Sequence, residues 1–282
     1  MVTLKDIFQV ARLRLSENKI ENAYFEAKEL FCKVFGKEPL YLDMDSPADK
    51  EKCALFESLI NRRVNGEPLQ YILGEWEFYS LPIRVGKGVL IPRQDTETLV
   101  DTAIELYKDK CGITVIDLCS GSGCIGLAIE KNLDVKELIL AEKSPDAIEY
   151  LKENILLNNS KAEILEGDIL SEDIISHLPM ADLIVSNPPY LSSDDMQNLQ
   201  REVEFEPSEA LFGGDDGLDF YRSIARLYKF KLNTGGRLIF EIGINQERDV
   251  LNILIAEGYK NVSVNKDLCF VSRVVSGEKN DG

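Results

Sequence analysis

Histidine is nearly absent from this chain of 282 residues, and its cysteines are few and scattered. His177 is the single histidine, so a Ser-His-Asp or Cys-His catalytic arrangement would have to include it. It lies in a short helical stretch just before Pro179, where we expect a helix terminus or a surface position. The six cysteines include no C-x-x-C pair, which argues against a zinc site and a disulfide framework. We therefore expect no metal in the functional site.

Long hydrophobic runs are also missing. No stretch approaches the roughly 18 to 20 apolar residues that a membrane-spanning helix needs, and the first residues lack the profile of a signal peptide. The composition, 44% hydrophobic and 29% charged, is that of a folded globular protein. We expect a cytoplasmic protein without a membrane partner.

Basic residues are outnumbered, because 32 Lys and Arg stand against 49 Asp and Glu and leave a net charge of -17. Residues 1–75 carry 11 basic and 13 acidic side chains, so nearly all of the acidic excess belongs to residues 76–282. A field of this sign repels phosphate backbones, and no local basic patch is visible. The charge thus argues against direct binding of nucleic acid.

Apolar residues at helical spacing predict three amphipathic helices, over residues 4–16, 21–35 and 47–65. Gly36 and Gly66 fall where a left-handed residue commonly ends a helix. Pro47 suits the first position of the third helix, with Asp45 or Ser46 as its N-cap. We expect a small helical domain over residues 1–67.

The period changes between residues 68 and 94, where short β-branched and aromatic segments are punctuated by Gly and Pro. These segments, residues 78–85 and 89–92, predict a β-hairpin connector. From residue 95 to 282, helical stretches alternate with seven short apolar strands, at residues 113–118, 138–141, 162–165, 183–186, 237–241, 261–264 and 269–275. Such alternation predicts an α/β fold with a mostly parallel seven-stranded sheet, helices on both faces and a final hairpin.

A glycine-rich turn follows the first of these strands, and residues 121–126 fit G-x-G-x-x-G. Glu142 ends the next strand, 21 residues after Gly121, so the spacing fits a dinucleotide-binding fingerprint. A nucleoside cofactor of another kind fits equally well. In either case Glu142 would accept hydrogen bonds from ribose hydroxyls. A tight turn without a ligand is the plainer alternative.

The tetrapeptide Asn187–Tyr190 directly follows another apolar strand. Its two prolines hold the backbone rigidly, leaving the Asn187 side-chain oxygen and the Pro188 carbonyl as acceptors in one cleft. The Tyr190 ring could form a stacking wall. Such a site suits a planar NH2 donor, although a bare turn would also favour Asn and Pro.

Three features together resemble an S-adenosylmethionine-dependent amino-methyltransferase: Asp117 with Gly121 and Gly123, Glu142, and Asn187–Tyr190. Further segments resemble the release factor glutamine methyltransferases, the HemK family, over nearly the full chain; they are residues 66–74, 77–79, 91–97, 206–211 and 217–219. One departure is Cys119–Ser120, where many relatives have Gly-Thr. If the turn requires backbone dihedral angles at position 119 that only glycine adopts readily, Cys119 would not meet this requirement.

The resemblance implies three parts: a helical substrate-recognition domain (1–67), the connector (68–94) and a Rossmann-like methyltransferase domain (95–282). It implies methyl transfer from S-adenosylmethionine, leaving S-adenosylhomocysteine, to the side-chain nitrogen N5 of the glutamine in the Gly-Gly-Gln motif of peptide chain release factors. Release factors are then the partners, and we expect a monomer.

The resemblance also assigns the site residues. The turn would admit the methionine part of the cofactor, Glu142 would hold its ribose and Asp168–Ile169 would border its adenine. The implied cofactor-binding set is Asp117, Cys119, Ser120, Gly121, Ser122, Gly123, Glu142, Asp168, Ile169 and Asn187. Asn187, Pro188 and Tyr190 would be catalytic, and with Pro189 they would bind the substrate.

Three other functions fit parts of the sequence. Adenine-N6 methylation of DNA is the main alternative, because those enzymes share the tetrapeptide, but the charge opposes it. A nicotinamide-dependent oxidoreductase would leave Asn187–Tyr190 unexplained, and a non-catalytic binding protein would not need the tetrapeptide.

Residues 191–217 carry eight acidic residues and one basic residue. This segment is either a solvated loop or a docking surface for a basic loop of the substrate. We expect Cys124 to be a small core-facing residue.

Overall fold

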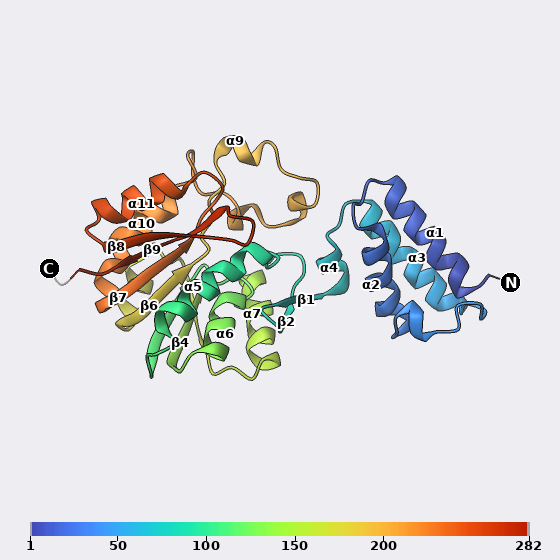
Figure 1. Cartoon of the computed structure of the whole chain (residues 1–282), viewed down its shortest axis with the longest axis horizontal. Coiled ribbons are helices and arrows are strands. Elements are labelled where there is room, and N and C mark those ends of the chain that lie inside the picture. Colours follow the sequence, from blue (N-terminus) through green and yellow to red (C-terminus); the bar gives the residue numbers. More distant parts are fainter. Residues whose placement is uncertain (1, 281–282) are drawn as a thin grey trace. The chain divides into compact units, whose positions relative to one another are not determined.

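The computed structural model describes residues 2–280 and divides the chain into two compact units. The N-terminal unit comprises Met1–Glu75 with Gln200–Phe205, and the sheet unit comprises Trp76–Leu199 with Glu206–Gly282. The helices of residues 4–73 in the first unit are blue to cyan in Figure 1, and the second unit contains the large sheet. No helix within residues 2–280 is long and apolar enough to cross a membrane.

The N-terminal unit is helical. Its elements are α1 (Leu4–Glu17), α2 (Ala23–Phe35), η1 (Pro39–Tyr41), α3 (Lys50–Val64), α4 (Leu69–Leu73) and η3 (Val203–Phe205). Phe31 is fully buried, and its ring makes edge contacts with Phe8 and Phe56 at centroid distances of 5.5 and 5.7 Å. Arg63, 3% exposed, donates to both carboxylate oxygens of Glu26 and also pairs with Glu202. Aromatic packing and this ion pair hold the unit together.

The helix ends follow the sequence at two places and depart from it at a third. Gly36 ends α2 with φ 76°, and Gly66 follows α3 with φ 99°, as expected. The expected start of the third helix at Pro47 is wrong, because α3 begins at Lys50 and its N-cap is Asp49. The Asp49 carboxylate accepts hydrogen bonds from two backbone N–H groups, whereas Pro47 forms a β-bridge with Thr3.

A hairpin occupies part of the expected connector. Strands β1 (Glu75–Phe78) and β2 (Leu81–Arg84) form a two-stranded sheet joined by Tyr79 and Ser80, whose φ angles are 49° and 61°. The turn therefore lies inside the segment 78–85 that the sequence suggested as one arm. Residues 89–92, expected to be the other arm, form no strand and instead line the cleft described below.

The sheet unit contains seven strands: β3 (Ile113–Leu118), β4 (Val135–Glu142), β5 (Glu163–Glu166), β6 (Ala181–Ser186), β7 (Leu232–Glu241), β8 (Lys260–Lys266) and β9 (Ser272–Glu278). Their order is β5-β4-β3-β6-β7-β9-β8, and β9 alone runs opposite to the other six. This confirms the predicted mostly parallel sheet with a final hairpin. The last strand starts later than expected, because the Asp267 side chain accepts from the N–H groups of Cys269 and Val271 and holds them in a turn.

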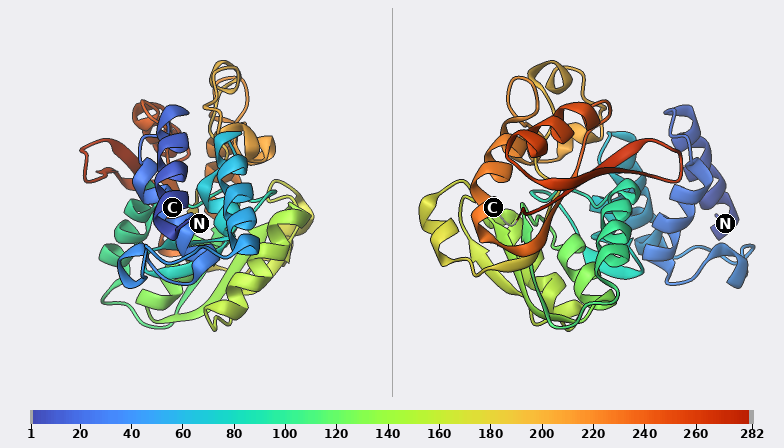
Figure 2. Two further views of the ribbon diagram at one scale, coloured as in Figure 1. Left: turned by 90° about the vertical axis from the view of Figure 1, so that its right-hand side faces the viewer. Right: turned by 60° about the vertical axis from the view of Figure 1, so that its left-hand side comes forward.

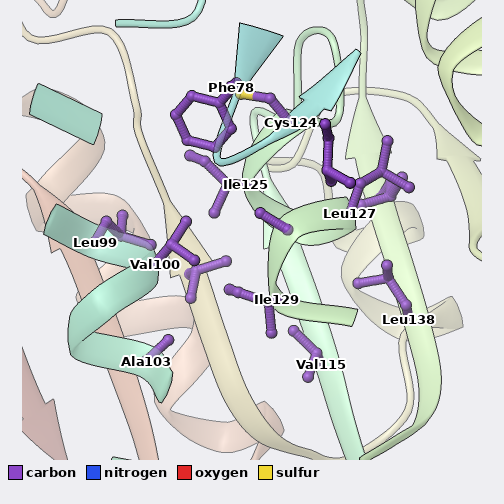
Figure 3. Close-up of a cluster of buried hydrophobic side chains, with 14 of the residues drawn as sticks. Phe78, Leu99, Val100, Ala103, Val115, Cys124, Ile125, Leu127, Ile129 and Leu138 are labelled. Carbon is purple, nitrogen blue, oxygen red and sulfur yellow. The ribbon is translucent and has the colours of Figure 1, made fainter. Parts of the chain in front are cut away.

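Helices cover both faces of this sheet (Figures 1 and 2). They are α5 (Glu97–Tyr107), α6 (Cys124–Asn132), α7 (Pro145–Leu157), α8 (Glu172–His177), α10 (Asp219–Tyr228) and α11 (Glu247–Ala256). The short helix α9 (Ser193–Met196) lies in the loop after β6, and the short turns are η2 (Gln94–Thr96), η4 (Ser208–Ala210) and η5 (Lys229–Lys231). Alternate residues of β3 face opposite layers, as expected for a strand. Val115 packs with α5 and α6 (Figure 3), while Ile116 packs with α10 and α11. The two buried layers fix where the strand ends lie.

The N-cap of α3 can be tested by substitution, because the sequence favours Asp45 or Ser46 as the cap whereas the structure has Asp49. We expect Asp49→Ala to lower the free energy of unfolding by about 1 kcal/mol, because two backbone N–H groups lose their acceptor. Asp45→Ala, at an exposed position, should change it by less than about 0.5 kcal/mol. Urea denaturation measures both variants. Equal losses for the two would contradict the placement of the cap.

Candidate active site

A cleft opens at the carboxyl ends of the parallel strands, where ligands bind in sheets of this kind. It encloses about 960 Å³ of space, open solvent at its mouth included. Its walls contain the residues that follow four neighbouring strands together with the stretch 88–93 after the hairpin. Four sets of the residues expected at a cofactor site line it: Cys119–Ser122, Glu142, Asp168–Ile169 and Asn187.

The glycine-rich turn forms one wall with left-handed backbone. Cys119, Gly121 and Gly123 have φ angles of 59°, 54° and 80°. Position 119 thus adopts a conformation that favours glycine while carrying a side chain, at a cost of roughly 1–2 kcal/mol. The Ser120 hydroxyl donates to the Asp117 carbonyl at 2.7 Å and closes the turn. The departure from Gly-Thr at this point is therefore compatible with the turn.

Asp117 and Gly123 lie behind this wall and are not among the described residues that line the cleft. Asp117 is fully buried, and its Oδ2 accepts from the Gly126 N–H at 3.0 Å. Burial raises the pKa of Asp117 to about 8. A Cβ at Gly123 would collide with Leu151, so this glycine is needed for close packing. Both residues shape the turn from below.

Glu142 is held rigidly at the end of β4. Its Oε1 accepts from the N–H groups of Lys143 and Ser144, and its Oε2 accepts from the Gly121 N–H, each at 2.8 Å. Two carboxylate oxygens offer about four acceptor positions, so one remains for a ligand hydroxyl. The carboxylate is 8% exposed and lines the cleft. The turn and Glu142 are thus locked together in a form that fits a ribose.

Asp168 and Ile169 continue the same wall after β5. The Asp168 carboxylate accepts from the Leu170 N–H at 2.9 Å, and the Ile169 carbonyl accepts from the Tyr228 hydroxyl at 2.8 Å. Ile169 is buried and presents an apolar surface beside the Asp168 acceptor. An apolar wall next to an acceptor fits a flat heterocycle with an amino group.

Within the tetrapeptide, Asn187 and Pro189 line the cleft, but Pro188 and Tyr190 are not among its described lining residues. The side chain of Asn187 makes no hydrogen bond to any described residue, so its donor and its acceptor are both available to a ligand in the cleft that this residue lines. The Tyr190 ring packs partly buried against the apolar layer of α10, and burial raises the pKa of its hydroxyl. Pro188 is buried.

Gln246 is a functional candidate that the sequence did not reveal. Its Nε2 donates to the carbonyls of Tyr190 and Gly217 at 3.0 and 3.4 Å, and its Oε1 accepts from the Gly243 N–H at 2.9 Å and the Tyr221 hydroxyl at 3.3 Å. One amide therefore ties the tetrapeptide to two loops. One signal in the sequence could have identified Gln246: it follows closely after β7, which ends at the same edge of the sheet as the strands around the cleft.

Glu206 anchors the stretch 88–93 of the cleft wall. Its carboxylate, buried in the sheet unit, accepts from the Ile91 N–H at 3.1 Å and pairs with Arg93. Five of the eight acidic residues in 191–217 have side-chain partners in this way: Asp195, Glu202, Glu206, Asp215 and Asp216. Much of the negative charge in this segment is therefore committed to the fold.

Two other residues considered from the sequence stand apart from the chemistry. His177 is exposed at the end of α8 and does not line the cleft. Cys124 lines it from the start of α6, but burial raises the pKa of its thiol to about 12, so the thiol is protonated at neutral pH.

Family models match the two parts of the chain. The PrmC N-terminal domain matches residues 6–74, and the methyltransferase small domain matches residues 96–207. A release factor glutamine methyltransferase from Thermodesulfovibrio yellowstonii is 40% identical over 95% of this chain and 97% of its own length. Another with the same name, from Geobacter sulfurreducens, is 38% identical over 98% of this chain and 96% of its own length.

Solved structures share the fold. A methyltransferase from Pyrococcus furiosus covers 72% of this chain and 91% of its own with a TM-score of 0.55 at 18% identity. The catalytic domain of hMettl16 covers 89% of this chain and 93% of its own with a TM-score of 0.59 at 14% identity. These structures show the fold alone. The methyltransferase family model and the two full-length relatives define the chain as an S-adenosylmethionine-dependent methyltransferase. The chain belongs to the release factor glutamine methyltransferase family, which confirms the resemblance drawn from the sequence.

The role of Glu142 in cofactor binding is directly testable. We expect Glu142→Gln to weaken S-adenosylmethionine binding by about 10- to 100-fold, because hydrogen bonds to charged groups contribute about 1.5–3 kcal/mol and the new NH2 would face backbone donors. Calorimetric titration measures the affinity. Glu149→Gln, an exposed position on α7, is the matched control and should leave it unchanged. Equal affinities of the two variants would refute the assignment.

Proposed function

We propose that this protein transfers a methyl group from S-adenosylmethionine to the side-chain nitrogen N5 of the glutamine in the Gly-Gly-Gln motif of peptide chain release factors. The observation that carries the proposal is the unused side chain of Asn187 in the wall of the same cleft as Glu142. The names of full-length relatives support the acceptor. We also propose a cytoplasmic, monomeric enzyme that binds no nucleic acid directly.

The acceptor amide needs orientation more than activation. The bound cofactor supplies an electrophilic methyl group on a sulfonium. A carboxamide nitrogen is a poor nucleophile because its lone pair is delocalised. We propose that the Asn187 side-chain oxygen and the Pro188 carbonyl accept the two N–H groups of that nitrogen and thereby direct it toward the methyl carbon. No described residue donates to the Pro188 carbonyl, which supports its availability.

The other site residues have supporting roles in this proposal. The turn with Cys119, Ser120 and Ser122 holds the methionine part of the cofactor, Glu142 its ribose, and Asp168–Ile169 its adenine. Asp117 and Gly123 act through the shape of the turn. Tyr190, fixed by Gln246 outside the cleft lining, bounds the acceptor site beyond Pro189. Residues 1–67 contribute recognition of the protein substrate.

The Asn187 side chain provides the test of this mechanism. We expect Asn187→Ala to lower kcat for a purified release factor by about 100-fold or more, because orientation of the acceptor is lost. The Kd for S-adenosylmethionine should stay within about threefold. Mass spectrometry of the factor locates the methyl group, and calorimetry measures the Kd.

The control for that experiment is Asn198→Ala, an exposed asparagine in the loop after the tetrapeptide. It should retain normal turnover. Unchanged kcat in Asn187→Ala, or a methyl group outside the Gly-Gly-Gln glutamine, would contradict the proposed function.

A further inference from the structure

A buried polar pair lies beside the tetrapeptide and has no part in the mechanism so far. Glu241 ends β7, and Ser186 of β6 pairs with Phe240, so Glu241 and Asn187 leave the sheet at neighbouring positions. Glu241 is 3% exposed, and its Oε2 has no hydrogen-bond partner among the described residues. The Thr96 hydroxyl, 2% exposed, also has none. A buried unpaired polar atom costs about 1–3 kcal/mol, so two together need an explanation.

Thr96 connects this pair to the cleft. It lines the same cavity as Asn187, at the end of η2 and directly before α5. Its hydroxyl faces the Glu241 carboxylate and lowers the pKa of that group, although Thr96 Oγ1 and Glu241 Oε2 do not meet in hydrogen-bond geometry. A hydroxyl can accept one proton while donating another. Thr96 is therefore placed to pass a proton from the cleft to a carboxylate behind it.

The charges around Glu241 leave it without a cation of its own. Arg273 pairs with Asp95 at 2.6 Å and with Asp267 at 3.0 Å, and Arg93 pairs with Glu206. Burial raises the pKa of Glu241 to about 7, while Thr96, Arg273 and Arg93 lower it and Asp95 raises it. The remaining titratable groups that face it are neutral at this pH because burial raises their pKa values; they are Tyr190, Tyr221 and Cys124.

Methylation of an amide nitrogen leaves that nitrogen with one proton too many. We propose that Thr96 and Glu241 remove this proton, with Thr96 as the relay and Glu241 as the acceptor. The inference rests on the proposed function for the identity of the nitrogen. In this proposal Thr96 and Glu241 take part in proton transfer although they lie outside the tetrapeptide. Such a role explains why these two polar atoms remain unpaired at the edge of the cleft.

The nitrogen lone pair forms the bond to the methyl carbon, and the sulfur–carbon bond breaks with its electron pair left on sulfur. Of the two protons on this nitrogen, one stays hydrogen-bonded to the Pro188 carbonyl. The other leaves its hydrogen bond to Asn187 and passes to Thr96 Oγ1, which releases its own proton to Glu241 Oε2. The product leaves as a neutral N-methyl amide, and Glu241 returns its proton through Thr96 to the solvent in the cleft. No oxidant, metal or further reactant is required.

Two pairs of substitutions test the relay. Glu241→Gln keeps the shape but cannot accept a proton, and we expect kcat to fall by about 100-fold, within the range for a general base. In Thr96→Val, kcat should fall by at least about tenfold because the hydroxyl is lost. Thr96→Ser keeps the hydroxyl and should retain most of the activity. Glu105→Gln, exposed on α5, is the matched control and should match the unsubstituted protein. Equal rates for Thr96→Val and Thr96→Ser would overturn the proposal, even if the Glu241 variant does not fold.

The pH dependence gives a readout that a structural role would not move. Only the carboxylate form of Glu241 accepts a proton, so kcat should fall as the pH drops through about 7, the pKa of this group. Glu241→Gln should lose that inflection. An inflection that persists in the variant would show that another group produces it, and the proposal would be wrong.

Glu241 can also be titrated without turnover. In the full-length protein with 13C-labelled glutamate and no cofactor, the carboxyl resonance missing from Glu241→Gln should titrate near pH 7. Titration below about pH 5 would overturn the proposal. If the unsubstituted protein failed to methylate release factors while this resonance titrated near 7, the proposed acceptor would be wrong and the buried proton acceptor would stand.

Discussion

The parallel pairing of β3 with both β4 and β6 is the constraint on which the site depends. Leu118 pairs with Ala141 on one side and with Ser186 on the other, so three chain segments leave the sheet side by side. The glycine-rich turn, Glu142 and Asn187 are each the next residues in their segments. Apolar layers on both faces fix this register, because a shift by one residue would move every side chain of a strand into the opposite layer, against the wrong packing partners.

Polar contacts convert that shared edge into a shaped cleft. Glu142 binds the turn through the Gly121 N–H, Gln246 fixes the Tyr190 carbonyl, and Glu206 holds the stretch that contains Ile91. In each case a side chain forms a hydrogen bond with a backbone group in a distant loop. That backbone group has no partner in a helix or a sheet. The cleft also retains costs, including the left-handed backbone at Cys119. Such strain and unpaired polar atoms gather at functional sites, where the surrounding fold sustains them.

The sequence predicted the features that depend on local patterns. Seven strands, the final hairpin and the turn before Cys124 all follow from apolar runs and glycines, and they place Glu142 and Asn187 at one edge. It could not predict the role of Gln246 or Glu206, because a side chain that binds a distant backbone leaves no period or motif. The cap at Asp49 was missed for a local reason, since Pro47 with a preceding Asp or Ser offered an equally good start. The exclusion of Tyr190 from the cleft lining depends on packing against α10, which no spacing shows.

The central claim is that this cleft presents a glutamine side chain of a protein to the methyl donor. The most direct test is transfer of labelled methyl from S-adenosylmethionine to a purified release factor, to the same factor with its Gly-Gly-Gln glutamine replaced by alanine, and to duplex DNA. The account predicts label on the unsubstituted factor alone. Label on DNA, or equal label on both forms of the factor, would contradict it.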